Sequence, residues 1–105
     1  MFEVMKPYYS DYVEYAMRYY VKCQKSGQLP DFRTAADRAN YMSCYTALYK
    51  IPQREKDLVV SVYASKDTLP DNVYAYCQLH GVEQSWVWAV IRRVERKFAT
   101  VRGLI

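Results

Sequence analysis

Tyr76-Cys77-Gln78-Leu79-His80-Gly81-Val82 joins a helical pattern to a glycine turn. A helical pattern leads into Gly81, and a second helical pattern begins near Gln84. Gly81 supplies the backbone freedom for a tight turn. Cys77 is small enough to let two helices approach, and Val82 closes the corner between them. The stretch therefore predicts a helix-turn-helix layout, which occurs in DNA-binding proteins and also in plain hairpins of two helices.

Turn signals on either side of this stretch divide the chain into five predicted helices. Thr34 and Thr68 each have an aspartate three residues later, which is typical of a helix N-terminal cap. Pro52 suits the first position of a helix, because that position needs no N–H donor. Strand signals are weak. The helices are expected at about residues 8–25, 34–49, 52–66, 68–80 and 84–100.

This order of elements predicts an all-α fold class of about five helices in a single domain, residues 1–105. Residues 1–50 form a tyrosine-rich helix pair, which is expected to pack on a helix-turn-helix-like unit of three helices in residues 51–105.

Four of the predicted helices repeat apolar side chains every three to four residues, so each is expected to bury one face. The expected buried residues are Tyr8, Tyr12, Tyr15 or Ala16, Tyr19 and Cys23 in the first helix, Ala39, Met42, Tyr45 or Thr46, and Tyr49 in the second, Leu58, Val59, Val62 and Tyr63 in the third, and Val87, Val90, Ile91, Val94 and Phe98 in the fifth.

Tyrosine is unusually frequent, with twelve in the chain. In the first predicted helix the tyrosines cover more than one face, so some of them lie outside a monomer core. Two interpretations stay open. The helix forms a homodimer interface or a partner groove, or it wraps the bundle with its hydroxyls exposed at the rim.

Composition places the chain among ordinary globular proteins, with 51% hydrophobic and 25% charged residues. Charges interrupt every long apolar window, so we expect no membrane contact through a spanning helix. Met1–Met5 does not resemble a secretory leader. The three cysteines have no Cys-x-x-Cys spacing, which favours reduced thiols. These features predict a cytoplasmic protein.

The net charge of +4 is concentrated at one end of the chain. Residues 1–83 hold ten basic and ten acidic residues, whereas residues 84–105 hold five basic residues against Glu95 alone. A basic patch on one element favours an anionic partner such as nucleic acid. Cations also collect at solvated helix C-termini, which is the alternative.

The fifth predicted helix carries the candidate binding residues. Its face opposite the aliphatic stripe is expected to point outward. If it is a recognition helix, Gln84, Ser85 and Arg92 reach base edges and the other cations contact phosphates. Trp88 beside arginines is also the composition of protein-binding hot spots. The candidate DNA- or partner-binding set is Gln84, Ser85, Trp88, Ala89, Arg92, Arg93, Arg96 and Lys97.

Ile51-Pro52-Gln53-Arg54-Glu55-Lys56-Asp57-Leu58-Val59 resembles the opening of the C-terminal promoter-recognition region of bacterial sigma factors, and residues 73–101 lie where its helix-turn-helix follows. The run that includes residues 67–74 and Arg102-Gly103-Leu104-Ile105 is also similar to small proteins of phages and mobile elements of Firmicutes. The resemblance implies a sigma-like helix-turn-helix protein that binds promoter DNA.

Catalytic patterns are poor. His80 is the only histidine, and Cys77 at the preceding turn has no second ligand pair to complete a zinc site. We therefore expect His80 to line the core. The three glycines are isolated, so no phosphate-cradling loop is predicted. We expect no enzyme activity, no metal and no cofactor.

Two functions follow from these patterns. The first is a DNA-binding transcriptional regulator of a phage or mobile element, with double-stranded DNA as its partner. The alternative is a small protein-binding inhibitor, for example an anti-CRISPR protein, that occupies the nucleic-acid-binding surface of a host protein. Glu83 separates them, because a carboxylate before the recognition helix repels phosphate and can instead pair with a basic residue of a protein target.

Overall fold

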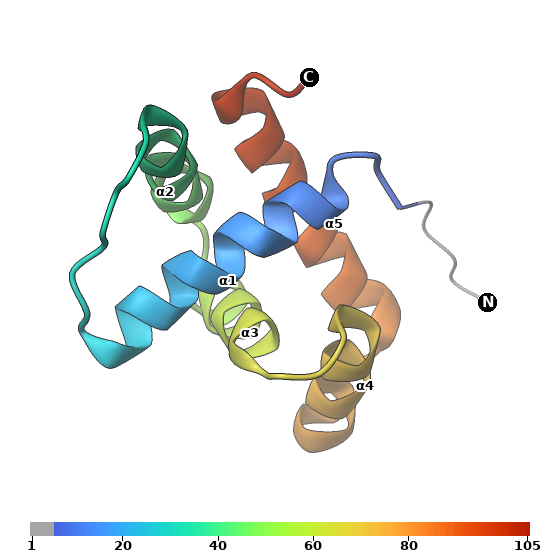
Figure 1. Cartoon of the computed structure of the whole chain (residues 1–105). Coiled ribbons are helices and arrows are strands. Elements are labelled where there is room, and N and C mark those ends of the chain that lie inside the picture. The colour runs from blue at the N-terminus through green and yellow to red at the C-terminus, as the bar shows by residue number, and fades with distance from the viewer. Residues whose placement is uncertain (1–5) are drawn as a thin grey trace.

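The computed structural model describes residues 6–105, and this part of the chain forms five helices and no strand. They are α1 (Ser10–Ser26), α2 (Ala35–Leu48), α3 (Gln53–Ala64), α4 (Leu69–His80) and α5 (Gln84–Arg102), shown in Figure 1. The predicted all-α fold of about five helices is confirmed. Met1–Met5, on which the expectation about a leader rests, lies outside the described residues.

The predicted caps and turns set the helix ends. Thr34 Oγ1 accepts the Asp37 N–H at 3.1 Å, and Thr68 Oγ1 accepts the Asp71 N–H at 3.3 Å. Pro52 is the N-cap of α3, one residue before the position expected for it. Gly81 has φ 65°, a left-handed conformation, and its N–H donates to the Cys77 carbonyl at 2.9 Å. Residues on both sides of the predicted turn are therefore helical.

Buried Asn72 fixes the turn between α3 and α4. Its Nδ2 lies 3.0 Å from the carbonyl oxygens of Val62 and Ser65 and 3.1 Å from that of Asp67. The Val62 and Ser65 carbonyls lie at the end of α3, where carbonyls lack helical partners, and the two N–H groups of the Asn72 amide are shared among the three oxygens. One side chain thus holds the start of α4 against the end of α3.

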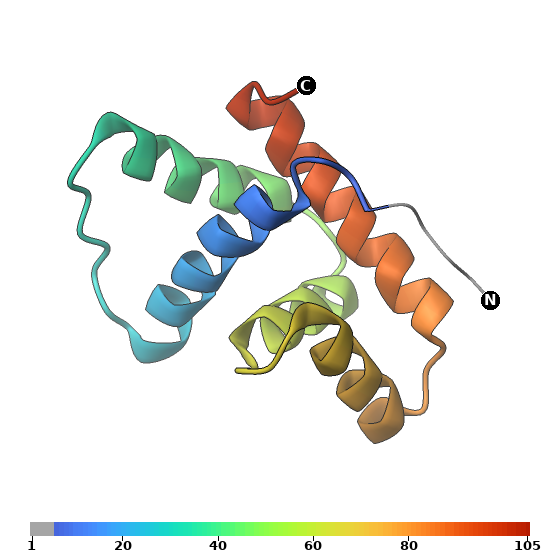
Figure 2. The same ribbon diagram turned by 45° about the vertical axis from the view of Figure 1, so that its right-hand side comes forward.

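α5 is the element on which the others assemble. α2 packs mainly on α5, and α1 crosses between α2 and α3 while also contacting α5. Both views place α2 beside the C-terminal part of α5 and α4 near its N-terminal part (Figures 1 and 2). α1 and α2 therefore pack on α3 and α5, and one continuous core joins the five helices.

The aliphatic stripes predicted for α3 and α5 are confirmed. All nine residues have side chains with at most 2% exposure: Leu58, Val59, Val62, Tyr63, Val87, Val90, Ile91, Val94 and Phe98.

The stripes predicted for α1 and α2 are largely wrong. In α1 the prediction is confirmed for Ala16 and Cys23, but Tyr8 and Tyr15 are 79% and 77% exposed. The other apolar residues that α1 buries are Val13, Met17, Tyr20 and Val21. α2 buries Ser43, Cys44, Ala47 and Leu48, which leaves Met42, Tyr45 and Tyr49 about half exposed. Small and aliphatic side chains let the helices approach closely, whereas the tyrosine rings carry a hydroxyl that favours the rim.

The expectation for His80 is also wrong, because this side chain is exposed at the end of α4. Its ring stacks on Tyr76 with centroids 4.1 Å apart. Cys77, one turn earlier, is buried as expected. Across residues 6–105, every helix is too short or too polar to cross a bilayer.

Candidate nucleic-acid interface

The exposed face of α5 is cationic. Buried aliphatic side chains orient the helix so that Ser85, Ala89, Arg93, Arg96 and Thr100 form an exposed stripe, which we call the α5 stripe. Lys97 lies exposed on its flank. Glu95, the only carboxylate of α5, has no exposed surface. The solvent-facing side of α5 therefore carries positive charge without a compensating carboxylate of its own.

The predicted outward position of Arg92 is wrong. Its side chain is only 16% exposed, and Nη1 lies 2.8 Å from Oε1 of buried Glu95. Ser10 Oγ donates to the other carboxylate oxygen of Glu95 at 2.7 Å. The Arg92 guanidinium also lies 4.7 Å from the Trp88 ring centroid. Arg92 is therefore directed toward the start of α1, where it compensates a buried charge rather than reaching a ligand.

Trp88 shares this inward side of α5. It is half-buried and packs against the core rather than standing on the outer face expected for it. Together with Leu69 and Pro70 of α4, it lines a small cavity of about 80 Å³. Trp88 thus connects α5 to the start of α4.

Arg93 lies on the α5 stripe but is not independent of α3. Its Nη2 lies 3.1 Å from Oε1 of Glu55, while 53% of the arginine side chain stays exposed. Within residues 6–105, neither Arg96 nor Lys97 forms an ion pair. Arg93, Arg96 and Lys97 line a hollow of about 290 Å³ beside Thr46 of α2. Three of the predicted cations are therefore brought together.

The remaining candidate binding residues lie at the start of α5. Ser85 and Ala89 are exposed, whereas Gln84 is half-buried. Glu83 is the exposed N-cap residue, and within the described chain its carboxylate makes no cap hydrogen bond. Its charge therefore stands beside the outer face of the helix start.

A further cation near α5 was missed by sequence reasoning. The Arg54 guanidinium lies 4.4 Å from the ring centroid of Trp86, on the side of α5 next to α3. Arg54 is exposed and extends the basic surface from α5 onto the first turn of α3. The sequence signal was weak, since the two residues lie on different predicted helices.

Known proteins provide no template for this surface. No family model, curated protein or solved structure matches the chain.

Proposed function

We propose that the protein is a DNA-binding transcriptional regulator of a phage or mobile element that docks on duplex DNA through α4 and α5. The observation that carries the proposal is the α5 stripe with Lys97, an exposed cationic face on the second of two helices joined at Gly81, which we interpret as a helix-turn-helix. The resemblance of residues 51–59 to the sigma-factor region supports the same function.

The exposed residues divide into two roles. Ser85 lies in the first turn of α5, the part of a recognition helix that reaches base edges, and half-buried Gln84 lies beside it. Arg93, Arg96 and Lys97 follow along the helix at positions suited to phosphates. Because only about three cations of α5 are available, phosphate contacts from Arg54 of α3 complete the surface.

Binding of a fluorescent duplex, followed by anisotropy at low salt, tests this proposal. The variant Arg96→Gln with Lys97→Gln is expected to weaken binding about tenfold or more. Its matched control is Lys22→Gln with Lys25→Gln, two exposed lysines near the far end of α1. We expect the control to bind nearly as well as the parent. Absence of duplex binding by the parent at low salt would reject the proposal.

A protein-binding inhibitor is the second candidate, and the outer side of α1 favours it. Tyr15 is largely exposed there, as is Tyr8 just before α1, and tyrosine is enriched at protein interfaces. The same side would serve a homodimer. Tyr15→Ser would then weaken a protein complex or self-association in analytical ultracentrifugation, and would leave DNA affinity unchanged.

A further inference from the structure

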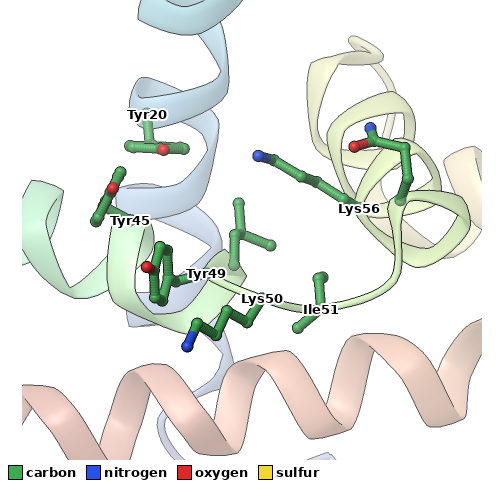
Figure 3. Close-up of a pocket in the computed structure, with 8 residues that line it drawn as sticks. Tyr20, Tyr45, Tyr49, Lys50, Ile51 and Lys56 are labelled. Atoms are coloured by element: carbon green, nitrogen blue, oxygen red, sulfur yellow. The ribbon is translucent and has the colours of Figure 1, made fainter.

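A pocket of about 350 Å³ lies where α1, α2 and α3 meet, next to the turn between α2 and α3 (Figure 3). Lys50 and Lys56 line it, and no described residue of its lining carries a carboxylate. Gln53 Nε2 donates to Asp57 Oδ1 at 2.7 Å, so the amide oxygen of Gln53 is the group that can accept a hydrogen bond from a ligand. The pocket is therefore suited to an anionic ligand with polar edges.

Two aromatic rings form one wall of the pocket. The Tyr45 and Tyr49 rings are stacked, with centroids 5.8 Å apart and an angle of 27° between their planes. They remain 50% and 54% exposed, so each offers area for a flat ligand. Lys50 Nζ lies 5.5 Å from the Tyr49 centroid. A positive charge therefore stands beside a stacking surface, which is the combination that binds unpaired bases.

The walls of the pocket formed by α1 and α3 carry polar groups. Figure 3 shows Lys56 extending from α3 across the pocket toward Tyr20 of α1. Burial, with a smaller effect of Tyr41, raises the pKa of Tyr20 to about 12, so its hydroxyl stays a neutral hydrogen-bond donor. Lys50 has φ 64°, a left-handed conformation uncommon outside glycine. The turn thus holds a lysine where asparagine or glycine is favoured.

We propose that this pocket binds one unpaired nucleotide, with its base on the Tyr45 and Tyr49 rings (Figure 3) beside the Lys50 charge and its phosphate bound by Lys56. The volume lies near the lower end of about 300–1,000 Å³ for small-molecule sites, which fits a single nucleotide. Free mononucleotide and an unpaired residue of a strand share this chemistry. The inference is independent of duplex binding by α5, because the α5 stripe does not line the pocket.

An NMR titration of the ¹⁵N-labelled full chain with deoxyadenosine monophosphate tests the site. We expect saturable shifts of amides in residues 45–56, and no such shifts with inorganic phosphate at the same concentration. Shifts that phosphate reproduces, or no shifts in these residues, would overturn the proposal.

Two variants test whether Lys50 and Tyr49 contribute to nucleotide affinity. Lys50→Asn removes the charge with a residue that tolerates the left-handed conformation, and Tyr49→Leu removes the ring. Each is expected to weaken nucleotide binding about fivefold or more. The matched controls Lys66→Asn and Tyr74→Leu change exposed residues outside the pocket and should bind as the parent does. Equal weakening by the well-folded controls would refute a specific site.

The source of the nucleotide is resolved by competition. If the site takes a residue of a strand, a duplex with a single-stranded adenine overhang should displace deoxyadenosine monophosphate more strongly than the blunt duplex does. If it takes free nucleotide, both duplexes should displace it equally poorly. Arg96→Gln with Lys97→Gln is expected to leave mononucleotide binding unchanged, which separates this site from the proposed duplex interface.

Discussion

Replacing Arg92 by alanine is expected to destabilise the protein far more than replacing its neighbour Arg93. The two arginines are adjacent on α5 but face different surroundings. Arg92 is paired with Glu95, whose side chain is fully buried, whereas Arg93 is 53% exposed beside Glu55. Arg92→Ala therefore leaves a fully buried carboxylate that keeps only its hydrogen bond from Ser10, whereas Arg93→Ala leaves Glu55, whose side chain is 17% exposed to water.

The expected losses of unfolding free energy differ several-fold between the two variants. Removing one partner of a buried ion pair costs about 3–5 kcal/mol of unfolding free energy. A pair that stays in contact with water contributes roughly 0.2–1 kcal/mol, and Arg93 with Glu55, which are 53% and 17% exposed, should lie near the upper end. Since a small domain has a total stability of about 5–15 kcal/mol, Arg92→Ala should remove a large part of it. At about 4–8 °C per kcal/mol, the melting temperature should fall by more than about 10 °C.

Urea denaturation followed by circular dichroism gives the unfolding free energies of Arg92→Ala and Arg93→Ala under one set of conditions. Combining Arg92→Met with Glu95→Met should recover much of the loss, because the buried charge is removed together with its partner. Equal destabilisation by Arg92→Ala and Arg93→Ala, within about 1 kcal/mol, would refute the assignment of Arg92 to the interior.

Three further substitutions or treatments test other parts of the structure. Gly81→Ala should lower the unfolding free energy in urea by about 1 kcal/mol, because the left-handed conformation is strained for any residue with a Cβ, even though nothing lies near the added atom. An unchanged urea midpoint would contradict the left-handed turn. Burial raises the pKa of Cys44 to about 12, so at pH 8 its thiol should react with a thiol reagent only at the rate of unfolding, and fast labelling in the native state would contradict its burial. Glu83→Ser should tighten duplex binding several-fold with little change in melting temperature, whereas unchanged or weaker binding by the folded variant would count against docking of the α5 start.

Helix positions were predictable because their signals are local. The caps at Thr34 and Thr68 and the left-handed Gly81 each depend on residues within three or four positions of one another. The buried faces of α3 and α5 were equally clear, since aliphatic residues follow one helical period. Tyrosine gave no such signal in α1 and α2. When tyrosine is counted as an apolar residue, its spacing predicts a buried face, but most of these tyrosine rings lie on the exposed side of their helix.

The candidate site depended on contacts between distant segments. Ser10 and Glu95 lie far apart in the chain, and only the fold shows that they share a hydrogen bond that draws Arg92 inward. Neighbouring residues of a helix point in different directions, so Arg93 lies on the exposed face of α5 when Arg92 points inward. The pocket around Tyr49 was missed for a related reason, because it joins three helices and depends on a left-handed Lys50.

The salt dependence of duplex affinity shows whether the cations of α5 contact phosphates. If Arg96 and Lys97 contact phosphates, the logarithm of the parent's association constant should fall linearly with the logarithm of salt concentration. The variant Arg96→Gln with Lys97→Gln should flatten that slope by about 0.9 per lost contact, whereas Lys22→Gln with Lys25→Gln should leave it unchanged. A parent that binds no duplex at low salt, or a slope that the α5 variant does not change, would contradict a DNA-binding face on α5.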